Sequence, residues 1–370
     1  MEYISLNRLG GAAGCPADAE AAARFRAALP EGCKGTFAVA RRIAPVIIDF
    51  DLVMQEGAAS VSLAKGLGLP VVPCIRRQVE RARTDFPQRL QLELTNCCNN
   101  DCVMCPRHGG HFTRKPKHME LDLVRRALDE IAQHYNYQLQ LFHIGEPLLH
   151  PRIFEILDML EDYPTLGRKW ISSKGQELTP DIMRRVLTSK VDYFNYSLLA
   201  MTPATYARIV PNGDYATVRG NLERLADLKR DLGVQRPYLR AQMIEMDEAL
   251  HEIDAFLDTW ADRVDLLSVN RLETFSNRID AKVTSAIKPR ESIGPRACKR
   301  LERGDLYILS NGEVTVCDTD FNGELSLGNL NETTLAEMAR GARYRQIIDS
   351  HERGDYSQIE LCRHCEDWNL

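Results

Sequence analysis

Stretches in which apolar and polar residues alternate are followed by stretches with a helical apolar period, from residue 88 to about residue 275. Alternation with a period of two is typical of a strand with one buried face, and apolar residues at every third or fourth position indicate an amphipathic helix. The predicted strands are residues 90–95, 139–144, 168–173, 192–199, 238–246 and 265–272. The predicted helices are residues 120–134, 151–160, 179–188, 215–232 and 248–261. Strands separated by helices pair in parallel through right-handed crossovers, so we expect an α/β sheet whose strands all end at one edge.

The region before this alternation, residues 1–85, is harder to interpret. Residues 19–29 have a helical pattern, and residues 45–50 and 69–73 contain the short apolar runs of strands. A small α/β unit of unknown role is therefore predicted. A module that recognises a peptide or docks a partner is one interpretation of it.

The loop after the first predicted strand carries Cys98, Cys102 and Cys105 in the spacing C-x3-C-x2-C. Three thiolates from one short loop can reach three irons of a cubane cluster and leave the fourth iron without a protein ligand. A metal site with an open position can bind and activate a small molecule, whereas a saturated site mainly stabilises a fold. The alternatives are buried thiols or a zinc knuckle, but zinc sites usually have a second nearby pair and the next cysteine here is Cys298. Cys97 does not fit the spacing and is expected to be a packed thiol.

A cysteine loop of this spacing at the end of the first strand resembles the radical S-adenosylmethionine (SAM) family. The resemblance implies a partial (β/α)6 barrel in which the open iron of a 4Fe-4S cluster binds the amino and carboxylate groups of SAM. In β/α barrels the functional residues collect at the carboxyl ends of the strands.

Residues 143–147, which follow the second strand, read HIGEP and resemble the Gly-Gly-Glu-Pro element of this family. Ile144 replaces the first glycine, while Gly145, Glu146 and Pro147 match. By resemblance these three residues form the contact to the SAM amino group. Alone, such a triplet is often only a turn, so its place one strand after the cysteine loop carries the assignment.

Two further strand ends fall where the family binds the rest of SAM. Residues 171–175 are similar to the family's Thr-Asn-Gly segment, which makes Ser173 a candidate ribose contact. Ser197 ends the fourth strand and Arg208 follows on the next helix, and by resemblance they hold the ribose and the SAM carboxylate. An arginine fork suits a carboxylate. The alternative is a strand-end hydroxyl and an ordinary surface arginine.

Cysteines return in the C-terminal part of the chain as Cys298, Cys317, Cys362 and Cys365. Four thiolates saturate a four-iron cluster. The set resembles the auxiliary-cluster region called Twitch, a shortened relative of the SPASM domain, so one auxiliary 4Fe-4S cluster is expected besides the SAM-binding one. A structural zinc in a four-cysteine ribbon is the alternative. The predicted domains are an N-terminal α/β unit over residues 1–85, the radical SAM partial barrel over 86–280 and the Twitch/SPASM-like region over 281–370.

The composition of the chain bears on its size, its partners and the compartment in which it works. The chain has 370 residues, of which 44% are hydrophobic and 27% charged, enough for a full core. Its formal charge of -5 gives no reason to expect nucleic acid as a partner. We found no apolar run of about 18 residues and no signal peptide, so no membrane association is expected. The 11 cysteines fall largely at metal-ligand spacings, which fits a reducing cytoplasm and not a disulfide-rich secreted domain.

The resemblance implies that an electron from the open cluster splits SAM into methionine and a 5′-deoxyadenosyl radical, which removes a hydrogen from the substrate. A flavodoxin or ferredoxin is the implied electron donor. Because a saturated auxiliary cluster has no open iron for substrate, its expected task is to accept an electron from the substrate radical. This points to oxidation of a carbinol in an amino sugar, aminocyclitol or related small molecule, as in the Twitch-bearing 2-deoxy-scyllo-inosamine dehydrogenases.

Other outcomes of the same radical chemistry stay open. A SPASM-type enzyme that modifies a peptide is one, and a sugar dehydratase or decarboxylase is another. Epimerisation needs a thiol as hydrogen donor, and the chain has no cysteine between Cys105 and Cys298. A non-catalytic metal-binding scaffold would gain nothing from an open iron.

The substrate contacts are expected at the ends of the last two strands, but the pattern identifies no catalytic base. Alternation along a strand places about half of the polar residues there on the wrong face. We expect Glu245 or Arg240 to contact the substrate. The full set of candidates is Arg240, Gln242, Glu245, Asn270, Arg271 and Glu273.

Overall fold

The computed structural model describes most of the chain from residue 86 onward and short pieces before it. The described residues are 2–3, 39–40, 51–54, 57–60, 86–87, 89–134, 136, 138–279 and 298–368. The predictions for residues 19–29, 45–50 and 69–73 lie outside the described residues.

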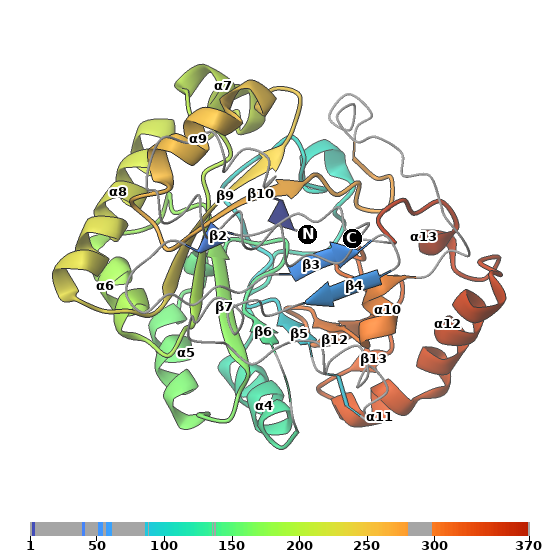
Figure 1. The fold of residues 1–370 in the computed structure, drawn as a ribbon. Coiled ribbons are helices and arrows are strands. Elements are labelled where there is room, and N and C mark those ends of the chain that lie inside the picture. The colour runs from blue at the N-terminus through green and yellow to red at the C-terminus, as the bar shows by residue number, and fades with distance from the viewer. Residues whose placement is uncertain are drawn as a thin grey trace.

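A run of parallel strands in sequence order forms the centre of the molecule (Figure 1). Each strand pairs in parallel with the next one along the chain. The strands are β5 (Arg89–Leu92), β6 (Gln138–Gln140), β7 (Arg168–Ser173), β8 (Tyr193–Ser197), β9 (Tyr238–Glu245) and β10 (Leu266–Arg271). These are the strands that the alternating pattern predicts, so the β/α array is confirmed and all carboxyl ends lie on one side.

Helices cover the outer face of this curved sheet (Figure 1). They are α4 (Leu121–Ala132), α5 (Ile153–Met159), α6 (Pro180–Thr188), α7 (Pro203–Ile209), α8 (Tyr215–Leu232) and α9 (Ile253–Trp260). In α4 the fully buried residues are Val124, Ala127, Leu128 and Ile131, which share one face at helical spacing. The four short 3-10 helices of the described chain are η2 (His108–Gly110), η3 (Pro147–Leu149), η4 (Leu160–Asp162) and η5 (Leu250–Glu252).

Alternation along β9 separates an apolar outer face from an inner face that carries polar side chains. Along β9, Leu239, Ala241 and Met243 are at most 1% exposed and belong to the core under the helices. Arg240 has the opposite parity, and its Nε donates to Ser268 Oγ of β10 at 3.0 Å. Gln242 and Asn270 are on the same inner face of the sheet as Arg240. Glu245, at the end of β9, is on the outer face by the same alternation.

The central sheet continues on both sides of the barrel strands. On one side β11 (Leu306–Ile308) pairs in parallel with β5, followed by the antiparallel strands β12 (Glu313–Thr315) and β13 (Gly328–Asn329). On the other side β1 (Glu2–Tyr3) and β2 (Val39–Ala40) pair antiparallel with β10. A separate hairpin joins β3 (Asp51–Met54) to β4 (Gly57–Ser60). The C-terminal helices are α10 (Lys299–Arg303), α11 (Leu335–Arg340), α12 (Ala342–Arg353) and α13 (Glu360–Arg363).

This pairing brings the C-terminal cysteine region against the first barrel strand, although more than 200 residues separate them in the sequence. The cysteine loop after β5 and the loops around β12 therefore share one end of the molecule. Within the described residues no helix is both long and apolar enough to cross a bilayer.

Candidate functional site

Three cysteines of the loop after β5 form the first candidate metal site. Burial raises the pKa of Cys98 and raises that of Cys105 to about 12, and each thiol is also affected by the charge of Cys102. Across the described residues no three metal-ligating side chains lie close enough for a single ion. Three thiols from one short loop are the donor set that a cluster ligated at three irons needs.

The segment after β6 packs directly on this loop. A Cβ built on Gly145 would lie 2.1 Å from the Thr95 carbonyl oxygen, so only glycine allows this approach. The backbone N–H of Glu146 donates to the Cys97 carbonyl oxygen at 2.8 Å. The structure thus brings the HIGEP segment and the cysteine loop together, as expected for a shared site.

The carboxylate of Glu146 is buried and held in one orientation. It accepts hydrogen bonds from the backbone N–H groups of Leu148 at 3.2 Å and Lys174 at 3.1 Å. The Ser173 hydroxyl also hydrogen-bonds it, and burial raises the pKa of the carboxyl above its ordinary value. Ser173 therefore lies beside Glu146 at the carboxyl end of β7, and Pro147 begins the short helix η3 that follows.

Lys174 is a member of this site that the sequence reasoning did not select. Its ammonium group donates to the Sγ of Cys102 and its charge acts on the thiols of Cys98 and Cys105. A cation next to thiols favours their charged form, which is the form that ligates iron. The sequence held one signal, because Lys174 directly follows Ser173 at the predicted end of the third strand.

Ser197 and Arg208 lie at the next positions around the barrel. Ser197 ends β8 and is half-buried. Arg208 is exposed, and its guanidinium donates to Thr205 Oγ1 on its own helix at 3.1 Å. The helix itself contacts the cysteine loop, since the Val103 N–H donates to the Ile209 carbonyl oxygen at 3.0 Å. The assignment of both residues to SAM stays a prediction.

The C-terminal cysteines come from separate elements. Cys298 precedes α10, Cys317 follows β12, Cys362 lies in α13 and Cys365 follows it. Burial raises the pKa of the thiols of Cys317 and Cys365, and the charge of Cys298 adds to the shift at Cys317.

A buried arginine ties this cysteine region to the end of the last barrel strand. Arg300 is 2% exposed, and its Nε donates a hydrogen bond to the carboxylate of Asp318, the residue after Cys317. It also donates to the Asp367 carbonyl oxygen at 2.6 Å. Its guanidinium also lies 3.3 Å from the carboxylate of Glu273, two residues after β10. Burial raises the pKa of Glu273 to about 7, helped by the negative charges of Asp318 and Asp367 and opposed by Arg300. About a third of the Glu273 side chain, 33%, remains exposed.

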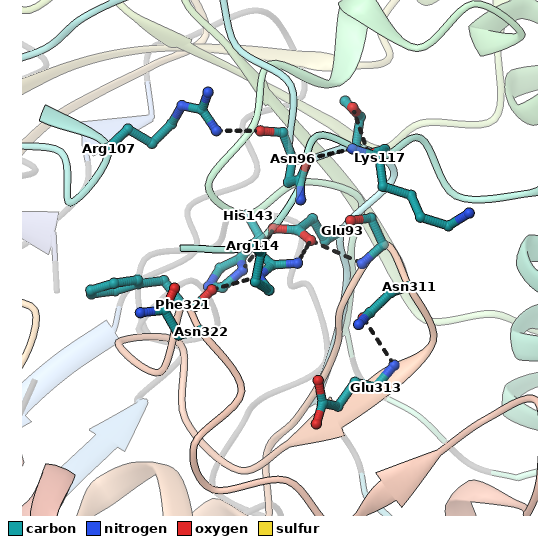
Figure 2. Close-up of polar contacts among 12 residues, drawn as sticks. Glu93, Asn96, Arg107, Arg114, Lys117, His143, Asn311, Glu313, Phe321 and Asn322 are labelled. Carbon is teal, nitrogen blue, oxygen red and sulfur yellow. Dashed lines mark hydrogen bonds and ion pairs between the residues drawn. The ribbon is translucent and has the colours of Figure 1, made fainter. Parts of the chain in front are cut away.

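A second buried charge network joins the barrel to the auxiliary region (Figure 2). Glu93, at the end of β5, accepts two hydrogen bonds from Arg114 at 2.7 and 2.6 Å, and Arg114 Nε donates to the Phe321 carbonyl oxygen at 2.7 Å. His143 Nδ1 lies 3.3 Å from Glu93, and its Nε2 lies 2.7 Å from the Asp318 carbonyl oxygen. Burial opposes ionisation of Glu93, but the hydrogen bonds and charges of His143 and Arg114 hold its pKa far below the ordinary range.

The segment after the first cysteine loop is held against the loop that follows Cys317. The Thr113 N–H donates to Asn322 Oδ1 at 3.0 Å, and Asn322 Nδ2 donates to the His111 carbonyl oxygen at 2.9 Å. The two candidate cluster sites therefore belong to one connected framework.

Two family models match these regions of the chain. The profile of the Radical SAM superfamily matches residues 92–253, and that of the SPASM iron-sulfur cluster-binding domain matches residues 298–366.

Curated relatives are distant. An uncharacterized protein of Treponema pallidum is 23% identical, covering 78% of this chain and 80% of its own length. The mycofactocin maturase MftC of Mycobacterium ulcerans is 23% identical, covering 75% of this chain and 70% of its own length. A cofactor-modifying protein of tungsten-containing aldehyde ferredoxin oxidoreductase from Pyrococcus furiosus is 24% identical, but the match spans only 44% of that protein.

Solved structures share the fold. BtrN in complex with AdoMet and 2-DOIA superposes with a TM-score of 0.53 at 15% identity, covering 75% of this chain and 92% of BtrN. SuiB of Streptococcus suis bound to the precursor peptide SuiA superposes with a TM-score of 0.56 at 14% identity, covering 77% of this chain and 76% of SuiB.

Proposed function

Because this chain is a radical SAM enzyme with a SPASM iron-sulfur domain, we propose that it oxidises a carbinol of an amino sugar, aminocyclitol or related small molecule. The cofactors are SAM and 4Fe-4S clusters, which the two domains imply. When bound, they supply a 5′-deoxyadenosyl radical that removes a substrate hydrogen and an auxiliary centre that takes up one electron.

The proposal assigns the ligands of both clusters. Cys98, Cys102 and Cys105 hold the SAM-binding cluster. The buried carboxylate of Glu146, oriented by two backbone N–H groups, is the acceptor for the SAM amino group. Lys174 lies against the same thiols and neutralises part of their negative charge. The auxiliary cluster is assigned to the four C-terminal cysteines, Cys298, Cys317, Cys362 and Cys365.

One observation carries the choice of oxidation. The partly exposed carboxylate of Glu273 at the carboxyl end of the barrel is linked through Arg300 to Asp318, the neighbour of Cys317. Oxidation of a carbinol removes a hydrogen atom from carbon, and then one proton from oxygen and one electron, to leave a ketone. Glu273 is our proposed base for the proton, because it lies at the carboxyl end of the barrel and its pKa is raised by burial and by the charges of Asp318 and Asp367. The electron leaves on the same side, toward Cys317.

The barrel interior offers polar contacts for such a substrate. Asn195 Nδ2 of β8 donates to Ser172 Oγ of β7 at 2.8 Å, and Arg240 reaches Ser268 and Asn270 on β10. Hydroxyl and amide groups of this kind suit the hydroxyls of a polyol. The contact of Glu245 or Arg240 with the substrate stays a prediction, to be tested with alanine variants.

The test uses anaerobic, reduced enzyme with SAM and deuterated aminocyclitol or amino-sugar pools. We expect deuterium in 5′-deoxyadenosine and a ketone product. In the Glu273→Gln variant 5′-deoxyadenosine should still form, while ketone formation falls by about 10²-fold or more, the usual scale for loss of a general base. Glu324→Gln is the matched control, because Glu324 is an exposed carboxylate paired with Arg278. An unchanged ketone yield and pH profile in Glu273→Gln would remove Glu273 from the mechanism.

Peptide modification is the second candidate function. It is favoured by the mycofactocin maturase among the relatives and by SuiB, whose structure holds a precursor peptide. Deuterium that reaches 5′-deoxyadenosine from a labelled peptide pool, and not from the carbohydrate pools, would replace carbinol oxidation by this alternative.

A further inference from the structure

Two buried hydroxyls lie between cysteines from opposite ends of the C-terminal region. Thr319 Oγ1 is 3.0 Å from Cys317 Sγ and 2.8 Å from Ser276 Oγ. Ser276 in turn hydrogen-bonds the thiol of Cys365. Thr319 is 0% exposed and Ser276 is 8% exposed. The hydroxyls thus form a continuous bridge from one proposed cluster ligand to another.

The backbone that carries Ser276 adopts an unusual conformation. Phe275, Ser276 and Asn277 follow β10 with φ values of 49°, 58° and 62°, in the left-handed region that residues other than glycine rarely occupy. Backbone strain of this kind persists only where the surroundings over-determine it, and it gathers at functional sites.

Asp367, two residues after Cys365, holds this turn in place. Its carboxylate accepts hydrogen bonds from Thr274 N at 2.8 Å, Thr274 Oγ1 at 2.8 Å and Ser276 N at 2.9 Å. Asp367 is 1% exposed, so the bonds are shielded from water. The end of the chain and the exit of the barrel are thereby joined in the geometry that directs Ser276 toward Cys365.

The number of hydroxyl and thiol hydrogens determines which hydrogen bonds can form along this bridge when the cysteines ligate iron. Two hydroxyls bring two hydrogens to three links, and each of the two thiols brings one more only while it is protonated. As thiolates, Cys317 and Cys365 are acceptors only. At least one hydroxyl hydrogen must then point at a ligating sulfur, because only one of the two can be used between the hydroxyls.

We propose that Ser276 and Thr319 are positioning residues for the auxiliary cluster: the hydrogen-bonded hydroxyl pair donates an O–H···S hydrogen bond to one of its cysteine ligands and raises its reduction potential. The inference rests on the proposed assignment of that cluster to Cys317 and Cys365. Hydrogen bonds to the sulfurs stabilise the more negative, reduced cluster and so favour electron uptake. The buried guanidinium of Arg300, whose charge acts on Cys317, has the same sign of effect.

The experiment is a potentiometric titration of the full-length holoenzyme followed by EPR. SAM alters the signal of the cluster that binds it, so the SAM-insensitive signal reports the auxiliary cluster. The variants are Ser276→Ala, Thr319→Val and their combination. Thr319→Ser keeps the hydroxyl. Ser310→Ala is the matched control, because Ser310 is 0% exposed and its hydroxyl has no hydrogen-bond partner within the described structure.

We expect the Ser276→Ala/Thr319→Val double variant, which removes both hydroxyls, to lower the potential by at least about 28 mV, a threefold change in the ratio of reduced to oxidised cluster at 59 mV per tenfold. The single variant that loses the hydroxyl donating to sulfur should show the same shift, while Thr319→Ser and Ser310→Ala stay at the wild-type potential. Iron content checks that each variant carries both clusters. Unchanged potentials in all hydroxyl variants with full iron would overturn the inference and leave the proposed function intact. A wild-type protein without a SAM-insensitive cluster signal would refute the auxiliary-cluster assignment instead.

Discussion

Replacing Arg114 by methionine tests whether the buried network around Glu93 joins the barrel to the auxiliary region. The Glu93 side chain is 0% exposed and that of Arg114 is 9% exposed. Arg114 donates two of the hydrogen bonds that the carboxylate accepts and a third to the Phe321 carbonyl oxygen. Methionine keeps most of the volume but removes the charge and all three donors.

The expected loss in the free energy of unfolding depends on how the buried Glu93 carboxylate is stabilised once Arg114 is replaced by methionine. Removing one partner of a buried ion pair destabilises by about 3 to 5 kcal/mol, because the other charge stays buried without compensation. Here His143 and the Ser310 N–H, 2.9 Å from Glu93, still contact the carboxylate. We therefore expect a loss near the lower end, about 3 kcal/mol in the free energy of unfolding.

Urea unfolding followed by circular dichroism measures this loss, and a double-mutant cycle with Glu93→Gln isolates the pair. The double variant should lose at least about 1 kcal/mol less than the sum of the single variants, since neither charge is then left alone. Arg152→Met is the matched control, because Arg152 is an exposed arginine paired with Glu155 and such pairs contribute about 0 to 1 kcal/mol. Additive single losses, or a loss no larger than in the control, would refute the reasoning.

The same network has a pH signature. The pKa of Glu93 is lowered in the folded protein, so its contribution to stability is present above the ordinary value of 4.5 and is lost as the pH falls below that value toward the folded pKa. Because Arg114 contributes to the lowering, Arg114→Met should weaken this acid-sensitive part of the stability, and Glu93→Gln should remove it.

Three more outcomes are expected. Gly145→Ala should lower the iron content of the SAM-binding cluster and leave the auxiliary cluster unchanged, because the alanine Cβ would lie 2.1 Å from the Thr95 carbonyl oxygen. Iron analysis combined with EPR measures this. Lys174→Met should shift the potential of the SAM-sensitive cluster to a more negative value, since a cation next to Cys102 is lost, whereas Lys174→Arg should retain it in the same titration. Removal of iron by chelation should increase hydrogen exchange across residues 298–368, where the four proposed ligands come from separate elements.

The order of elements could be predicted from the sequence. Alternating and helical periods are local properties, so they located the six barrel strands and the helices between them. The spacing of Cys98, Cys102 and Cys105 is also local, and it predicted a radical SAM fold that the family comparison confirmed. The C-terminal cysteine set predicted the auxiliary domain in the same way.

The sequence also selected strand ends but not the groups that face one another there. Ser173 and Glu146 were expected at one site, and the structure brings them into contact. Lys174, one residue further, reaches Cys102 and was missed. Arg208 is exposed on its short helix, and its expected contact with SAM stays a prediction.

What the tertiary structure alone decided is how distant segments meet. The pairing of β11 with β5 brings Asp318 next to His143, 175 residues earlier in the chain. The bonds of Asp367 to Thr274 span 93 residues and direct Ser276 toward a cysteine region that no local pattern connects to it. Periodicity encodes which face of an element is buried, but hydrogen bonds between loops depend on sheet order and on the packing of the whole core. The sequence thus determined the barrel and the positions of the two cysteine sets, and the tertiary structure decided the charged and hydroxyl groups that surround them.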